Sequence, residues 1–227
     1  MIKLENTVLA SPEQIEFIIE GMRNPMNSWE KSDSGYGCDS GLCGKQCAFS
    51  FQWCGNAQRY VLGDNDRSLM QRLANAGTDH RKFMRMMPVY VRITAPLYWW
   101  KEFDTYKVGT VANSCSTMHK IQEHILTIDD FSIEHLSVHS VQLIEEYIME
   151  INKALLYYRE HKDKDDWWQM IQLLPSSYNQ TRNVMLNYEV LANIYKSRKD
   201  HKLDEWREFC KWIEELPYSE LITGGNN

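Results

Sequence analysis

The stretch that decides the fold is "ITAPLYWWKEFDTYKVGTVANSCSTM", residues 93–118. Its first half is apolar and aromatic, whereas its second half, residues 105–118, is polar and interrupted by Gly109. That second half is too polar for a core strand and carries too little charge for a solvated surface. Buried polar groups without partners cost about 1–3 kcal/mol each. We therefore interpret residues 105–118 as part of a functional pocket; the alternative is a loop that only packs.

Length and composition set the class of protein. The chain has 227 residues, of which 43% are hydrophobic and 25% are charged, as in an ordinary globular protein with one sizeable core. Its net charge of -6 gives no reason to expect binding to nucleic acid or to an anionic membrane. No apolar run reaches about 18 residues, so no membrane span is expected. The first residues do not resemble a secretory signal, and we predict a cytoplasmic protein.

Hydrophobic periodicity predicts short elements first and long helices afterwards. Residues 81–96 alternate in part and predict a strand, with an edge or a bend at Pro88. Helices are predicted by apolar spacing and capping residues over 11–24, 64–77, 129–161, 175–198 and 204–216. This order favours a single α+β domain over residues 1–227.

A cysteine-rich loop is predicted at residues 35–55. Its four cysteines have the spacing C-x4-C-x3-C-x6-C and lie among several glycines: Cys38, Cys43, Cys47 and Cys54. Four thiolates on a flexible loop suit tetrahedral zinc, and an iron–sulfur cluster is a second possibility. The usual pair of C-x2-C knuckles is absent, so free thiols are the alternative to a zinc site.

The tandem aromatics and a histidine pair have plain structural interpretations. Trp99–Trp100 and Trp167–Trp168 are predicted to belong to the core; the alternative is that one ring of each pair lines a cofactor pocket. His135 and His139 are four residues apart and are interpreted as a surface pair on one helix face.

Residues 93–118 resemble the signature region of the flavin-dependent thymidylate synthases. That family has a strand, an Ala-Pro pair, a mostly aromatic helix and then R-H-R-x-x-S-x-N-E-x-S-x-R-Y. Here Ala95–Pro96 stand at the matching distance, and the signature falls without a gap on residues 105–118. Leu174–Pro175, the Asn that ends "SSYNQTRNVMLN" and the later "DEWREF" match the second half of the family pattern. The resemblance covers residues 60–127 and 165–216.

The resemblance implies an antiparallel sheet with a long helical C-terminal half. It also implies reductive methylation of deoxyuridylate, or of a related pyrimidine nucleotide, using FAD, NADPH and methylene-tetrahydrofolate, in a homotetramer. The site residues that it implies are His80, Arg81, Lys107 and Asn187 for the cofactor, Tyr106, Asn113 and Arg182 for the substrate, and Thr110 and Glu189 for catalysis.

The departures from the family pattern concern charge. Thr105 and Tyr106 replace two cationic residues of the signature, so that only Lys107 keeps a positive charge there. Glu189 stands where the family has an arginine, and its carboxylate would repel an anionic ligand unless Lys107 or Arg182 pairs with it. The alternative function is therefore a non-catalytic homologue that binds a nucleotide or a protein partner.

Overall fold

The computed structural model describes residues 2–37 and 59–224. Its centre is a four-stranded antiparallel sheet in the order β1 (Lys3–Leu9), β4 (Pro88–Pro96), β6 (Asn179–Asn187) and β5 (Val111–Ser114). The longest pairing joins β4 and β6 over nine residues each, from Pro88 opposite Asn187 to Pro96 opposite Asn179. The predicted antiparallel sheet is confirmed.

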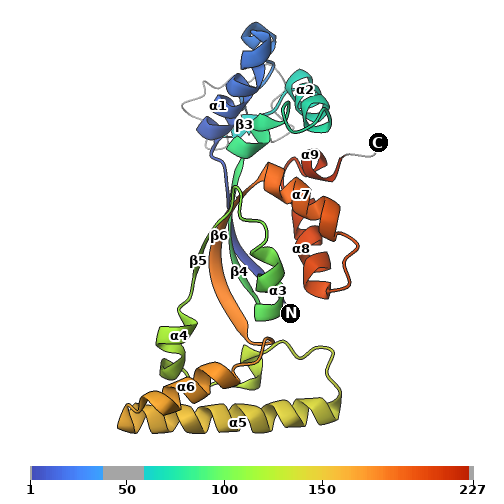
Figure 1. Ribbon diagram of the computed structural model, residues 1–227. Helices are drawn as coiled ribbons and strands as arrows, with labels where there is room; N and C mark the ends of the chain where they lie inside the picture. The colour runs from blue at the N-terminus through green and yellow to red at the C-terminus, as the bar shows by residue number, and fades with distance from the viewer. Residues whose placement is uncertain (1, 38–58, 225–227) are drawn as a thin grey trace.

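Helices cover one face of this sheet (Figure 1). They are α3 (Leu97–Phe103), α7 (Tyr188–Arg198) and α8 (Asp204–Glu214), while α9 (Glu220–Thr223) packs on α7 and α2 (Asp64–Asn75). Along β4, Val89, Val91 and Ile93 are buried on the covered face, whereas Tyr90 and Arg92 are exposed on the other. The period of two follows from the alternation of side chains along a strand.

An aromatic cluster joins α3 to α8 beneath the sheet. Trp99 is fully buried, and its ring centroid lies 4.9 Å from that of Trp100, 5.0 Å from that of Phe103 and 4.7 Å from that of Trp206. Each aromatic side chain removes a large apolar area from water, so this cluster holds α3 against α8. The prediction that Trp99 and Trp100 belong to the core is confirmed.

A second, smaller core lies at the other end of the sheet. There the long helix α5 (Val138–His161) packs on α6 (Lys164–Leu173), close to α4 (Thr117–Lys120), η5 (Ile121–Glu123) and η6 (Ile128–Asp130) (Figure 1). Ile151, Leu155 and Met170 are fully buried in this core. The molecule is consequently elongated, with α1 (Pro12–Arg23) and α2 (Asp64–Asn75) at the opposite end.

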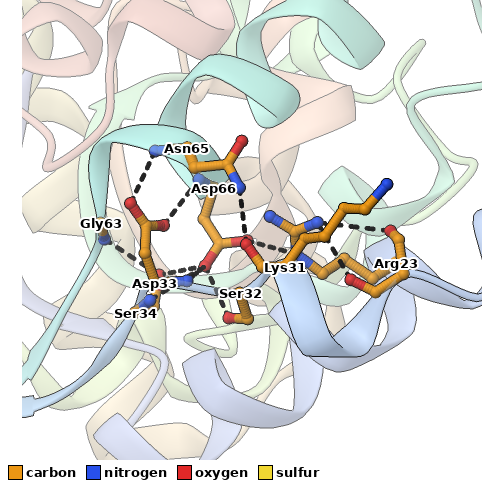
Figure 2. A network of polar contacts seen from close by, with 9 residues as sticks. Arg23, Lys31, Ser32, Asp33, Ser34, Gly63, Asn65 and Asp66 are labelled. Carbon is orange, nitrogen blue, oxygen red and sulfur yellow. Dashed lines mark hydrogen bonds and ion pairs between the residues drawn. The ribbon is translucent and has the colours of Figure 1, made fainter.

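A buried polar network holds the segment after α1 against the start of α2 (Figure 2). Asp66 is fully buried and accepts hydrogen bonds from Arg23 Nε at 2.6 Å, Ser32 Oγ at 2.7 Å and Ser34 Oγ at 2.6 Å. Burial raises the pKa of this carboxyl, but the hydrogen bonds from the serines and from Arg23 outweigh it and hold the pKa below its ordinary value. The network thereby anchors the segment that contains η1 (Asn24–Met26) and η2 (Trp29–Lys31) to α2. This segment leads into β2 (Gly35–Gly37), which pairs with β3 (Arg59–Val61).

The sequence-based element boundaries were wrong in four places. One is the start of the predicted loop 35–55, where Gly35–Gly37 form the strand β2. Residues 175–198 contain the strand β6 before the helix α7, because pairing with β4 and β5 overrides a spacing that also fitted a helix. Residues 81–96 begin with η4 (Lys82–Met86), and β4, with Pro88 as its first residue, is a central strand. Helix α5 begins only at Val138.

Two predictions about side chains change with these boundaries. His135 lies before α5, so it does not share a helix face with His139; its ring instead contacts Asp204 at 3.1 Å. Trp168 is 41% exposed, and of that tandem pair only Trp167 packs against the second core. Within the described parts of the chain, no helix has the length and apolar character needed to span a membrane.

Candidate functional site

The candidate site forms where the loop after α3 meets the first turn of α7. Asn187 ends β6 and caps α7, since its side-chain oxygen accepts a hydrogen bond from the Val190 amide at 3.0 Å. Its side-chain nitrogen donates to the Gly109 carbonyl at 3.4 Å. Gly109 has a φ of +77°, and a Cβ there would lie 2.8 Å from the Asn187 amide nitrogen. Glycine therefore allows the signature loop to lie directly on the helix start.

A pocket of about 300 Å³ opens beside this contact. Its lining residues come from the end of α3, the loop and β5: Phe103, Asp104, Tyr106, Lys107, Thr110 and Ala112. Among the described residues the exposed Lys107 ammonium has no ion-pair partner. The Thr110 hydroxyl is buried and has no hydrogen-bond partner within residues 2–37 and 59–224. An unsatisfied buried hydroxyl is costly, so a polar ligand atom in this pocket would remove a penalty.

Tyr106 is held in the pocket wall by an ion pair behind it. Its hydroxyl accepts a hydrogen bond from Arg198 Nε at 3.0 Å, and Arg198 pairs with Glu102 at 2.6 Å. The indole nitrogen of Trp206 also donates to Glu102, at 2.9 Å. Tyr106 therefore presents a fixed ring to the pocket.

Arg182 is likewise paired with a carboxylate. Its guanidinium donates to Asp104 at 2.7 Å and lies over the ring of Trp100, 4.1 Å from the centroid. Because Asp104 lines the pocket, Arg182 borders the site through this pair and contributes little net positive charge.

Glu189 has partners that the sequence analysis did not foresee. The carboxylate pairs with Arg81 at 3.2 Å and, more closely, with Arg85; neither Lys107 nor Arg182 contacts it. Burial raises the pKa of Glu189, but hydrogen bonds and charge from Arg85 and Arg81 hold that pKa below its ordinary value. Glu189 is therefore an ionised but neutralised group. The expected repulsion of an anionic ligand does not follow from its charge alone.

Three of the nine predicted cofactor, substrate and catalytic residues line the pocket: Tyr106, Lys107 and Thr110. Arg81 lines a separate hollow, and His80 and Asn113 also lie apart from the pocket. His80 is exposed in the turn before η4, and no described side chain pairs with it. Asn113 lies opposite Asn183 on the uncovered face of the sheet, whereas Ala112, one residue earlier, faces the pocket. Asn113 lines a different hollow, of about 400 Å³, together with Tyr90 and Arg92.

The predicted metal ligands fall outside the described residues. Cys38, Cys43, Cys47 and Cys54 all lie in 38–58. Within 2–37 and 59–224, no group of three or more His, Cys, Asp or Glu side chains could hold a metal ion. The zinc site stays a prediction, which metal analysis of the purified protein would test.

Four residues of the site region were missed by the sequence analysis: Arg85, Arg198, Glu102 and Asp104. The spacing of four between Arg81 and Arg85 is the one local signal that could have associated a missed residue, Arg85, with a predicted one. The carboxylate partners lie 78 to 104 residues away along the chain, a separation that no local pattern reveals.

Comparison with known proteins shows the fold. The chain is similar to the crystal structure of the flavin-dependent thymidylate synthase ThyX from Helicobacter pylori in complex with FAD and dUMP, with a TM-score of 0.61 and 15% identity. That match covers 98% of this chain and 97% of the other, and a second structure of ThyX from this organism with FAD and dUMP gives a TM-score of 0.60. No protein-family model matches the sequence, and no curated protein matches it.

Proposed function

We propose that this chain binds a flavin and a pyrimidine nucleotide and acts as a flavin-dependent thymidylate synthase-like enzyme. The proposed reaction is the reductive methylation of deoxyuridylate or of a related pyrimidine nucleotide, with FAD, NADPH and methylene-tetrahydrofolate. The observation that carries the proposal is the pocket between the end of α3, the loop after it and β5, with its Thr110 hydroxyl and Lys107 ammonium unpaired among the described residues, in a chain whose fold is similar to that of ThyX over 98% of its length.

The residues present fit part of such a ligand set. Lys107 would hold one phosphate group as a point charge, and the Thr110 hydroxyl would pair with a polar atom of the ring. Asn187 would keep the loop on α7, while the fixed Tyr106 would supply a flat wall for a ring to pack against. A reduced flavin, when bound, would supply a hydride.

The charge balance supports a second candidate function. Arg81, Arg182 and Arg198 are each paired with a carboxylate of the same chain, so the described pocket offers Lys107 as its unpaired cation. This suits one anionic group better than the several phosphates of a dinucleotide and its substrate. A non-catalytic homologue that binds a nucleotide or a protein partner would have the same pocket without the full set of cationic groups.

A spectrum and a turnover assay separate the two candidates. The purified protein should show flavin absorbance or take up added FAD, and saturation with FAD or dUMP should raise the unfolding free energy by about 2.7 kcal/mol at a hundredfold excess over Kd. Formation of thymidylate from deoxyuridylate with NADPH and methylene-tetrahydrofolate would support the enzyme. Nucleotide binding without turnover would support the non-catalytic homologue, and the absence of both flavin and nucleotide binding would contradict both proposals.

A further inference from the structure

Two guanidinium groups converge on a single carboxylate at the start of α7. Arg81 Nε lies 3.2 Å from one oxygen of Glu189 and Arg85 Nη2 lies 3.2 Å from the same oxygen, while Arg85 Nε donates to the other oxygen. Asn193, one turn further along α7, accepts a hydrogen bond from Arg81 Nη2 at 3.0 Å. Arg85 therefore forms a forked, two-bond contact, to which Arg81 adds a third bond.

This arrangement is that of a receptor for an oxyanion. The planar fork of arginine matches carboxylate and phosphate oxygens equally well, and such charge-assisted bonds are among the strongest in proteins. The Glu189 side chain is only 11% exposed. Its carboxylate oxygens occupy the positions that the oxygens of an external anion would take.

The receptor is open on two sides. The side chain of Arg85 is 51% exposed. The less exposed Arg81 lines a hollow of about 280 Å³ between α2, α7 and α9, which Asn193, Lys196 and Lys199 also line. An anion can therefore reach the guanidinium groups without unfolding the helices. The hydrogen bonds and the charge of Glu189 raise the pKa of Arg85, and the charge of Asp79 adds to this effect.

We propose that Arg81 and Arg85 form a phosphate-binding site that Glu189 fills as a built-in anion. In the native chain a phosphate must displace Glu189, so the site discriminates against ligands that place an anionic group there. Removing the charge of Glu189, while keeping the shape of its side chain, opens the site to a phosphate. This proposal does not rest on flavin binding, because inorganic phosphate is a sufficient probe.

The test compares phosphate and pyrophosphate binding to the native protein and to Glu189→Gln by isothermal titration calorimetry at low salt. We expect Glu189→Gln to bind at least tenfold more tightly than the native protein, and the gain to disappear in Glu189→Gln combined with Arg85→Gln. The matched control is Asp79→Asn, which removes one negative charge from the same cluster without vacating the receptor. It should change the affinity less than threefold.

The outcomes separate the proposal from general electrostatics. An equal gain in Asp79→Asn, a gain that survives the loss of Arg85, or native protein that already binds phosphate as tightly as Glu189→Gln would each overturn it. If Glu189→Gln is unfolded on its own, phosphate should restore its native circular dichroism and leave that of an unfolded control protein unchanged. Failure to restore it would also overturn the proposal.

Discussion

At the residue scale, the charge of the candidate site is set by carboxylates that neutralise its arginines. Glu102, Asp104 and Glu189 each hold a guanidinium group within this chain. Partly buried ion pairs of this kind fix positions, and they leave little net charge for a ligand. Lys107 lines the pocket and, among the described residues, has no ion-pair partner that neutralises its charge. Its contribution to ligand binding can therefore be tested.

Replacing Lys107 by alanine should weaken binding of a flavin or nucleotide about tenfold or more. The reason is that a hydrogen bond to a charged group contributes roughly 1.5–3 kcal/mol. Because Lys107 is exposed, the unfolding free energy should stay within about 0.5 kcal/mol of the native value. Calorimetric titration would measure the affinity, and Lys101→Ala, an exposed lysine on α3 outside the pocket, is the control. Equal affinity of Lys107→Ala and native protein would remove Lys107 from the site.

Replacing Asp66 by asparagine should destabilise the fold by about 3–5 kcal/mol, because it leaves the buried Arg23 guanidinium without its counter-charge. Urea denaturation would measure this loss, with the exposed Glu30→Gln as control.

The contribution of Asp66 to stability depends on pH with a definite sign. Since the folded-state pKa of Asp66 is lowered, its stabilisation is present above the ordinary value of 3.8 and is lost as the pH falls through the folded-state pKa. If the native protein and Asp66→Asn lost stability in parallel below pH 3.8, the ionised Asp66 carboxylate would not be the source of this stabilisation.

At the element scale, the site depends on how the loop of residues 104–110 is attached to the turn between β6 and α7. Asn187 is both the last residue of β6 and the cap of α7, so one side chain fixes the helix start and the loop. Gly109, which lies against the Asn187 side-chain amide, is the residue at which this attachment can be tested.

Gly109→Ala should destabilise the protein by roughly 1–2 kcal/mol through its left-handed backbone alone. Further loss is expected because the new Cβ would lie 2.8 Å from the Asn187 amide and 3.1 Å from a methyl group of Val190. Gly77→Ala is the matched control, since its φ is also positive, at +104°, while its surroundings are open. Only Gly109→Ala should also weaken nucleotide binding. If both variants changed the nucleotide affinity equally, the loop would not contribute to the binding site.

At the scale of the whole molecule, the elongated shape leaves one side of α5 without a partner among the described residues (Figure 1). Val138, Met149 and Leu156, spaced by 11 and 7 residues, lie on one side of the helix and are 80%, 63% and 55% exposed. The opposite side of α5 packs on the second core. Apolar residues on both sides are typical of a helix that is buried in an assembly.

The expected homotetramer makes this side of α5 a candidate subunit interface. Sedimentation equilibrium should give four times the chain mass of 26.8 kDa for the native protein. Met149→Asp combined with Leu156→Asp should lower that mass, because two buried charges would oppose association. Glu146→Ala combined with Glu150→Ala, at exposed positions on a different side of the same helix, should not. A native protein that sediments as a monomer would contradict the prediction.

The sequence by itself determined the α+β class and the aromatic core on α3, and its resemblance to a known family added the antiparallel sheet and the position of the signature loop, residues 105–118. The Ala-Pro pair and the aromatic run lie close together in the sequence and could be recognised locally, whereas Gly109 acts through Asn187, 78 residues away. Only the tertiary structure decided that residues 179–187 form a strand, that Asn113 faces away from the pocket and that Glu189 pairs with Arg81 and Arg85. Strand pairing and ion pairs join residues about 70 to more than 100 positions apart, and their energies depend on distances that exist only once the chain is folded.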